Sequence, residues 1–550
     1  MTADGTNASA GGTNVGTEGT ESNAARTDAN AGRTRASAGR TRAGAERTRP
    51  GTMLFRQIRA EWTKIRTVRR WTLTLLAAAV AMVVVSLLGA SGGSVQHAGG
   101  PEAPPPKGPD GKVVRDAFRF VHQEMRGDGT ITAHLASLKS LVEGEAGSKS
   151  VPWATAGIMV KSGLRPGASY VALLSTRGHG IRLQNDFTHD KAVSADGTWL
   201  RLTRSGSRFT AYVSSDGTSW KTAGGVTVRG IPANARVGVF AASPPHTEMS
   251  RRFGSLSILD APAHAIGTFD NVTVTGAEPG GWTGTTVGEP LPEFDPPGAP
   301  PRTPLVKDGS SVSGGTITVT GSGEIAPEQR GMDLVQKGLQ GALVGMLVVV
   351  AVGALSMTSE FRHGLVRTTF TVLPRRGGML VAKALVLGVT VFAVSAVALA
   401  VAFPIAQSRL RSSGFRPPGF PSWSLSDPEA LRAIAGSALL VALVAVLAMA
   451  FGAVFRHSAA AIAVVLLIVL VPQILASALP LGASRFLLSV TPAAGFAVQQ
   501  SQPHYAFTAD MCLPEDGCYP FSPWAGLAVP FLYVLVAMLL AWWLLRRRDA

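Results

Sequence analysis

The chain has 550 residues, more than one ordinary domain; 46% are hydrophobic and only 16% are charged. A soluble protein has roughly 25% charged residues, and here the apolar residues gather in a few runs, so the composition indicates a membrane protein. The net charge is +16. Much of the excess lies beside apolar runs, where Lys and Arg anchor helices on the cytoplasmic side, so we expect no nucleic-acid partner.

Residues 1–52 consist mainly of Gly, Ala, Thr, Asn and Arg, with almost no large apolar side chain. Such a segment cannot bury enough surface to offset its ordering entropy, so we expect a disordered tail. It either contacts lipid headgroups or a partner, or is a neutral extension. The organised sequence begins at Met53, so either Met1 or Met53 is the start of the protein.

The segment 53–90 combines a basic amphipathic stretch with the first apolar run. Phe55, Ile58, Trp62 and Ile65 recur at three- and four-residue spacing, and most basic residues lie off that stripe. This pattern predicts a helix in the inner headgroup layer. The run from Trp71 to about residue 90 has no charge and is long enough to cross the membrane. Its length and its distance from residue 1 favour a retained helix over a signal peptide.

Residues 91–335 have a different composition and residue pattern from the apolar runs. Segments 91–112 and 277–335 are linkers rich in Pro and Gly, and residues 308–325 within the second could add strands. Between them, residues 113–276 alternate apolar and polar side chains in short stretches separated by turn residues, for example RFTAYVSSDG at 208–217. This alternation predicts an antiparallel β-sandwich.

Residues 336–550 contain the remaining apolar runs. They cover 338–357, 384–406, 433–454, 459–480 and 524–545. The predicted fold class is therefore an α-helical membrane protein with six transmembrane helices and an all-β sandwich inserted between helices 1 and 2. The 485–498 stretch contains Pro492 and is too short to cross, so we expect a re-entrant or interfacial element, or a loop on the headgroups.

The Arg and Lys distribution orients these helices. The segment before the first helix, the loop 358–383 and the C-terminal Arg546–Arg548 are basic and should lie in the cytoplasm. Both termini are then cytoplasmic and residues 91–335 extracytoplasmic, in a cell membrane. The loop 407–432 is an exception to this rule, because it carries four Arg but would lie outside.

The chain has two cysteines, Cys512 and Cys518, which are too few for a disulfide framework or a cysteine zinc cluster. They fall in an outside loop, where an oxidising compartment favours a disulfide between them; the alternative is two free thiols.

Signatures of chemistry on this chain are absent from the sequence. The phrase nearest to a phosphate-binding G-x-x-x-x-G-K-[ST] is GEAGSKS at 144–150, which lacks the Gly-Lys pair, and neither HExxH nor GxSxG occurs. The apolar runs hold no ionisable residue well inside, whereas ion-coupled transporters need such groups. We therefore expect no catalytic residue, no metal and no cofactor here, and a motor on another chain.

Two phrases carry a family resemblance: RAEWTKIRTVRRW at 59–71 and LSMTSEFRHGLVRTTFTVLPRRGGMLVAKAL at 355–385. Over residues 54–90 and 336–550 the chain resembles the type-2 ABC permease family. The resemblance implies a coupling loop that docks into an ATPase subunit, with ATP and magnesium on that partner. The matching positions are Ser359, Glu360, Phe361, Arg362, Gly364, Arg367, Thr368 and Thr369. Alternatively, these basic residues only satisfy the topology rule. The resemblance also implies a second permease copy or a paralogue, within a lipid bilayer.

The strand-rich segment resembles the concanavalin A-like or laminin-G-like sandwich in the phrases WATAGIMVKSG (153–163), TWLRLTRSGSRFTAYVSSDGTSW (198–220), ARVGVFAAS (235–243) and FDNVTV (269–274). Relatives of that fold often bind glycans on aromatic and polar side chains. The candidates here are Trp153, Tyr170, His179, Arg182, Gln184 and Trp199. The alternative is that these residues belong to the core or rim.

The sequence thus predicts the permease subunit of an ATP-driven exporter with an unidentified cargo, amphipathic or lipid-like by the apolar helices. The alternatives are a membrane-anchored glycan-binding or sensing protein without transport, and an immunity permease that expels an antimicrobial peptide.

Overall fold

The computed structural model describes residues 50–92, 104–143, 149–252, 255–277, 281–289, 306–328, 332–362, 376–417, 420–509 and 512–548. The predicted tail 1–52 lies outside them except for its last three residues, which begin a helix.

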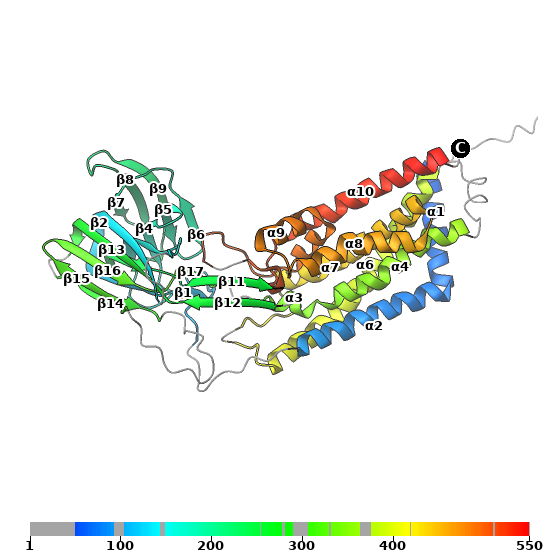
Figure 1. Ribbon diagram of the computed structural model, residues 1–550, viewed down its shortest axis with the longest axis horizontal. Coiled ribbons are helices and arrows are strands. Elements are labelled where there is room, and N and C mark those ends of the chain that lie inside the picture. Colours follow the sequence, from blue (N-terminus) through cyan, green and yellow to red (C-terminus); the bar gives the residue numbers. More distant parts are fainter. Residues whose placement is uncertain are drawn as a thin grey trace, which may run out of the picture. The chain divides into compact units, whose positions relative to one another are not determined.

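Two helices precede the strands: α1 (Pro50–Thr67) and α2 (Arg69–Ser91). The helices after the strands are α3 (Leu334–Gly338), α4 (Gly341–Arg362), α6 (Arg376–Ser412), α7 (Pro428–Phe455), α8 (Ser458–Leu475), α9 (Leu481–Val490), η1 (Pro492–Gln499), η2 (Pro514–Asp516) and α10 (Pro523–Arg548). Figure 1 labels most of them. Val68 separates α1 from α2 with extended backbone angles, so the basic segment and the first apolar run form two helices.

The strands of the first half are β1 (Val114–Asp116), β2 (Phe118–Val142), β3 (Thr155–Lys161), β4 (Tyr170–Thr176), β5 (Gly180–Asn185), β6 (His189–Ala192), β7 (Trp199–Ser205) and β8 (Arg208–Ser214). Those of the second half are β9 (Lys221–Thr227), β10 (Asn234–Ala242), β11 (His246–Arg252), β12 (Ser255–Ala261), β13 (Ala263–Ala277), β14 (Thr283–Val287), β15 (Gly309–Ser313), β16 (Thr316–Gly321) and β17 (Ile325–Pro327).

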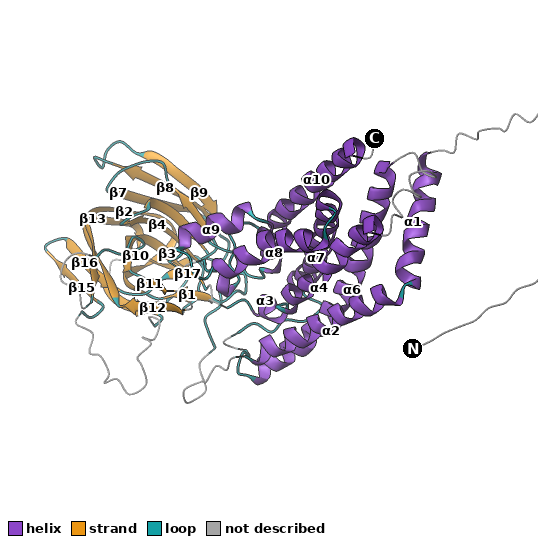
Figure 2. Cartoon of the chain, turned by 45° about the vertical axis from the view of Figure 1, so that its right-hand side comes forward, coloured by secondary structure: helices purple, strands orange, loops and turns teal. Residues whose placement is uncertain are grey.

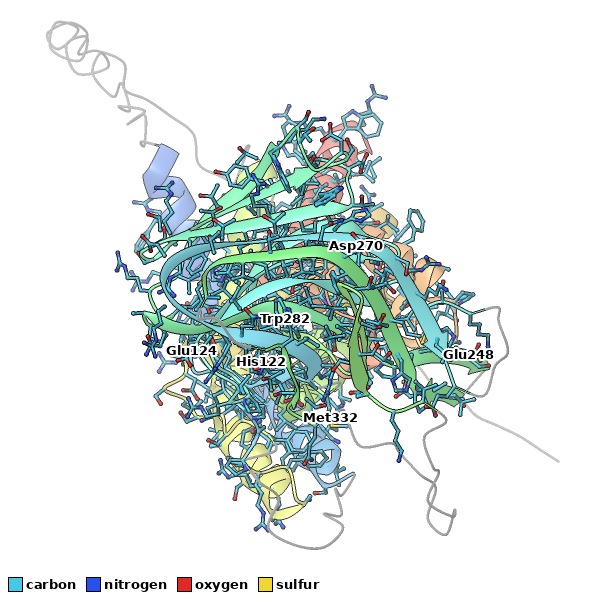
Figure 3. The ribbon with its side chains drawn as sticks, turned by 90° about the vertical axis from the view of Figure 1, so that its left-hand side faces the viewer. His122, Glu124, Glu248, Asp270, Trp282 and Met332 are labelled. Carbon is cyan, nitrogen blue, oxygen red and sulfur yellow. A yellow bond between two sulfur atoms is a disulfide. The ribbon has the colours of Figure 1, made fainter. Side chains whose placement is uncertain are left out.

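Thirteen of the described strands form one antiparallel sheet with the main order β15-β16-β13-β2-β10-β3-β4-β5-β6. The long strand β2 organises it, because β10 pairs with Arg119–Arg126 and β7 pairs with Gly129–His134. Gly127, between these two stretches, has a φ of 73°, which glycine adopts without strain. Figure 3 shows β2 curling through the sheet, with His122 and Glu124 on it and Asp270 on neighbouring β13.

The predicted fold class was wrong in three respects. Helices hold 44% and strands 30% of the described residues, so the fold is mixed rather than helical with an insertion. The strands form one curled sheet of 13 strands instead of a two-sheet sandwich. They also follow the second helix, because the basic segment forms the separate helix α1. Alternation identified strands, but strand pairing depends on contacts between distant segments.

Six helices in the described ranges are long and apolar enough to cross a membrane: α2, α4, α6, α7, α8 and α10. The helix α7 is the most buried of them and packs against α4, α6 and α10 (Figure 2). A Cβ atom on Gly353 of α4 would lie 2.2 Å from the carbonyl oxygen of Ala445, so glycine permits this close approach to α7. The α9–η1 pair, which covers most of 485–498, is bent by 100°.

Candidate functional site

The predicted coupling segment is described in part. Ser359, Glu360, Phe361 and Arg362 form the last turn of α4. Gly364, Arg367, Thr368 and Thr369 lie outside the described residues. The chain is described again from Arg376, where α6 begins, so the helices α4 and α6 flank the segment 363–375.

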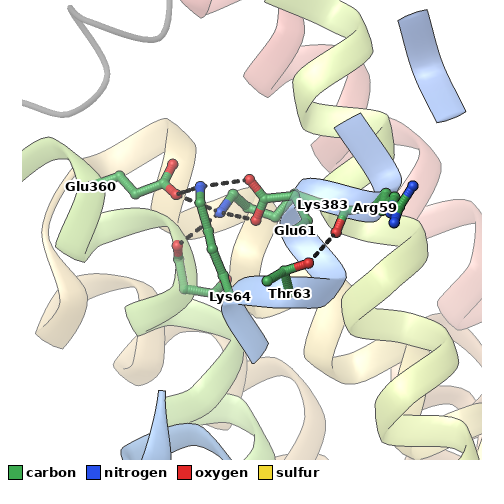
Figure 4. A network of polar contacts seen from close by, with 7 residues as sticks. Arg59, Glu61, Thr63, Lys64, Glu360 and Lys383 are labelled. Atoms are coloured by element: carbon green, nitrogen blue, oxygen red, sulfur yellow. Dashed lines mark hydrogen bonds and ion pairs between the residues drawn. The ribbon is translucent and has the colours of Figure 1, made fainter. Parts of the chain in front are cut away.

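Glu360 belongs to a cluster of four charged side chains, which we call the charge cluster: Glu61, Lys64, Glu360 and Lys383 (Figure 4). Lys383 Nζ lies 2.8 Å from Glu360 Oε1 and 3.0 Å from Glu61 Oε2. Lys64 Nζ lies 2.8 Å from Glu61 Oε1 and 3.2 Å from Glu360 Oε1. Each carboxylate therefore contacts both ammonium groups, and the cluster has no net charge.

Local structure explains how these residues meet. Glu61 and Lys64 are three residues apart on α1, a spacing that places both on one helix face. Glu360 ends α4, and Lys383 lies about two turns into α6. Lys383 also donates a hydrogen bond to the backbone oxygen of Ser356, at 3.5 Å. Three helices thus meet in one ionic contact.

Burial differs within the charge cluster. The side chains of Glu61, Glu360 and Lys383 are 12%, 10% and 7% exposed, whereas that of Lys64 is 53% exposed. Burial alone would raise the pKa of Glu61, but the charges and hydrogen bonds of Lys383 and Lys64 lower it on balance. Burial lowers the pKa of Lys64, and its bonds to Glu61 and Glu360 raise it on balance. Both groups are therefore ionised at neutral pH.

One oxygen of the charge cluster has no partner. Glu360 Oε2 is buried and accepts no hydrogen bond within the described part of the chain. At the following residue of α4, the Arg456 guanidinium lies 5.0 Å from the ring centroid of Phe361, a cation–π contact. Arg456 ends α7 in the left-handed conformation, with a φ of 56°. The turn between α7 and α8 therefore also contacts the end of α4.

Sequence reasoning placed Glu360 in the coupling segment and Lys383 beside it, but it missed that α1 completes the cluster. A signal was present, because Glu61 is the one acidic residue in the basic segment 54–70. One acidic residue among so many basic ones suggests that Glu61 forms an ion pair with a basic side chain elsewhere in the chain. The partner could not be identified, because it is 322 residues away in sequence.

The predicted ligand residues of the strand region do not form one site. Trp153 and His179 stack with ring centroids 3.8 Å apart, and the Arg182 guanidinium lies 5.4 Å from a Trp153 ring centroid. Burial lowers the pKa of His179, and Arg182 adds to this effect. Arg182 is held on β5 by a two-pronged contact with Asp190.

The other three candidates lie elsewhere. Tyr170 is fully buried among aromatic rings around Lys161, whose Nζ is 5.3 Å from the Tyr170 ring centroid. Gln184 is buried as well. Trp199 stacks on His134 with a centroid separation of 4.9 Å.

Cys512 and Cys518 form a disulfide. Together with His504 they are the group of potential metal ligands found in the described residues, with all ligand atoms within 4.8 Å of one another. A metal needs the thiolate form of cysteine. Because the two sulfur atoms are bonded to each other, this group does not fit a metal ion.

No family model matches the chain, and no curated protein matches it. One similar solved structure is the crystal structure of a functionally unknown protein from Saccharomyces cerevisiae. The two sequences are 17% identical, and the TM-score is 0.18. The alignment covers 34% of this chain and 94% of the yeast protein. Such a low score supports no conclusion about fold or function.

Proposed function

We propose that this chain is the membrane-spanning subunit of an exporter driven by a separate ATPase subunit. The charge cluster is the observation that carries this proposal. Three of its four side chains are largely buried, and buried charges are costly to hold unless they are paired with one another. Here they join α4 and α6, the helices that flank the segment 363–375, to the basic helix α1. A displacement of that segment would therefore move three helices together.

The proposed topology follows the basic residues. The segment 363–375 and the basic face of α1 lie in the cytoplasm, where a soluble ATPase can reach them. The strand region lies outside the membrane, in the compartment that also oxidises Cys512 and Cys518. The host membrane is a cell membrane. ATP and magnesium are bound by the partner, and this chain holds no nucleotide.

The proposed assembly contains two permease chains, because one coupling segment serves one of two nucleotide sites. ATP binding closes the ATPase pair and moves both segments, which reshapes a path between the two chains. The cargo is amphipathic or lipid-like. The apolar character of the six candidate spans supports this assignment.

Co-purification from the native host tests the proposal. The full-length chain should retain a nucleotide-binding protein, and Glu360→Ala or Arg362→Ala should reduce its recovery at least fivefold. Arg409→Ala is the matched control for Arg362→Ala, because it removes an exposed arginine at the opposite end of a span. Equal recovery from all variants would reject the assigned segment, and recovery of no ATPase from the wild type would reject the function.

A membrane-anchored glycan-binding protein is the second candidate, and the contacts among Trp153, His179 and Arg182 favour it. Trp153 is partly buried and stacked on His179, and an aromatic side chain with polar groups beside it is typical of a ligand pocket. Glycan-array binding by the wild-type chain that is lost in Trp153→Ala, but kept in Trp199→Ala, would support it. No binding above background would exclude it.

A further inference from the structure

A long apolar groove runs between α2 and α6, and three residues of α1 line one of its ends. Its volume is about 770 Å³, within the range of roughly 300–1,000 Å³ that is usual for ligand pockets. The α2 wall extends from Thr72 to Val84, and Val394 and Val401 belong to the α6 wall. Apart from Arg66 and two threonines, every lining residue is apolar. The groove therefore suits hydrocarbon rather than a polar ligand.

The length of the groove corresponds to one leaflet of a bilayer. Val84 follows Thr72 by twelve positions on α2, which is roughly 18 Å at a rise of 1.5 Å per residue. The whole hydrocarbon core is about 30 Å thick, so one leaflet accounts for about half of that. An acyl chain that enters from the α1 end would reach the bilayer midplane inside the groove.

The α1 end of the groove is cationic. Arg66 lines the groove there, and no carboxylate among the described residues forms an ion pair with it. The nearby acid Glu61 is occupied by Lys64 and Lys383. Trp62 also lines this end and is 49% exposed, and an amphipathic indole ring favours the headgroup level. This end offers an unneutralised positive charge at headgroup depth.

We propose that an anionic phospholipid of the inner leaflet occupies this groove, with one acyl chain between α2 and α6 and its phosphate on Arg66. The proposal does not depend on transport. In this proposal α1 has two roles. One face binds the lipid headgroup, and the other carries Glu61 and Lys64 of the charge cluster. The lipid composition of the membrane would thereby affect the positions of α1, α4 and α6, the three helices that the charge cluster joins.

A second copy of the chain fits the groove less well. A helix about 10 Å across and 18 Å long occupies roughly twice the volume of the groove. Such a helix would cover the groove without filling it. It would also need an acid opposite Arg66, whereas a lipid phosphate supplies that charge directly.

Fluorescence quenching in nanodiscs that contain the full-length chain tests the proposal. The probe is phosphatidylglycerol with bromine near the headgroup end of its acyl chain, and brominated phosphatidylcholine is the neutral comparison. Subtracting the Trp62→Phe signal isolates the emission of Trp62. At equal mole fraction we expect the brominated phosphatidylglycerol to quench Trp62 more strongly.

Two variants and their controls separate the headgroup from the acyl chain. Arg66→Gln should weaken the preference for phosphatidylglycerol about fivefold, which is the effect of one basic residue near an anionic surface. Arg59→Gln, an exposed arginine of the same helix outside the groove, should not. Ala393→Phe should fill the groove and reduce quenching by both lipids, whereas Val389→Phe, on the exposed surface of α6, should not.

Native mass spectrometry keeps the proposal testable if Ala393→Phe folds poorly. The wild-type chain, purified from a mixture of the two lipids, should retain phosphatidylglycerol, and Arg66→Gln should retain less. Equal quenching by both lipids with no effect of Arg66→Gln would overturn the proposal. So would a Trp62 signal shielded from both lipids in a stable dimer, because a second copy would then occupy the groove.

Discussion

Lys383 Nζ on α6 lies 2.8 Å from Glu360 Oε1 on α4, and both side chains are at least nine-tenths buried. Glu61 on α1 contacts the same ammonium group. The helices that flank the segment predicted to bind the ATPase are therefore tied to each other and to the basic helix α1.

Removing either lysine of the charge cluster should have unequal effects. Lys383→Met leaves two largely buried carboxylates with one lysine, and losing one partner of a buried pair costs about 3–5 kcal/mol. Lys64→Met removes a half-exposed cation, and such pairs contribute at most about 1 kcal/mol. Thermal unfolding in detergent should therefore show a much larger loss for Lys383→Met. Equal losses would mean that Lys383 is solvated rather than buried.

The disulfide between Cys512 and Cys518 should be present in cells. Cross-linking such a short loop stabilises a chain by roughly 2 kcal/mol in the chain-entropy model. Cys512→Ser combined with Cys518→Ser should lower the unfolding temperature, and reductant should lower that of the wild type equally. The double variant, which has no cysteine left, should not respond to reductant. Thiol labelling of the denatured, unreduced wild type would contradict an outside position for this loop.

His264 should make the sheet edge more stable in acid. Its Nε2 lies 3.1 Å from Glu143 Oε1, and its Nδ1 lies 3.3 Å from Asp308 Oδ1. Burial lowers the pKa of His264, but these two carboxylates raise it on balance above 6.5. A raised folded-state pKa gives stability that is fully present below the unfolded pKa and is lost as pH rises through the folded pKa.

Amide exchange of β13 and β16 measures this effect. Protection, corrected for intrinsic exchange, should be greater at about pH 5.5 than at about pH 8.5, on either side of the imidazole titration. His264→Gln should remove the difference, and His189→Gln, an exposed histidine of the same sheet, should leave it. Greater protection at the higher pH would show that His264 is neutral when folded.

Much of the helical part could be predicted because each candidate span carries its own signal in length and apolarity. Among the described residues, six helices are long and apolar enough to be candidate spans, or up to seven if the bent α9–η1 pair counts as one. Only part of the charge cluster could be predicted. Glu360 lies in a recognisable sequence motif, whereas the ion pair between Glu61 and Lys383 depends on how α1 packs against α6. Tyr170 illustrates another limit, since an aromatic residue in a strand looks the same whether it faces a ligand or the buried Lys161.

The sheet was the least predictable part. Apolar and polar residues alternate in the same way in the strands of a sandwich and of one curled sheet. The long strand β2 is what joins the strands into one sheet here. That strand pairs with β7 and β10 along its length and with β13 and β14 as well. Strands β14, β15 and β16 also join this sheet, although they lie beyond residue 276. These pairings connect segments far apart in sequence, which no local pattern reveals.

Site-specific photo-crosslinking in the native host tests the central claim most directly. A photoreactive residue replaces Val366 in the segment 363–375, and another replaces Leu425 in the loop predicted to lie outside. We expect Val366 to crosslink to a nucleotide-binding protein, with a yield that changes when ATP is depleted, and Leu425 to give no such product. If Val366 crosslinks only to lipid, or to a protein without a nucleotide site, this chain is not driven through that segment.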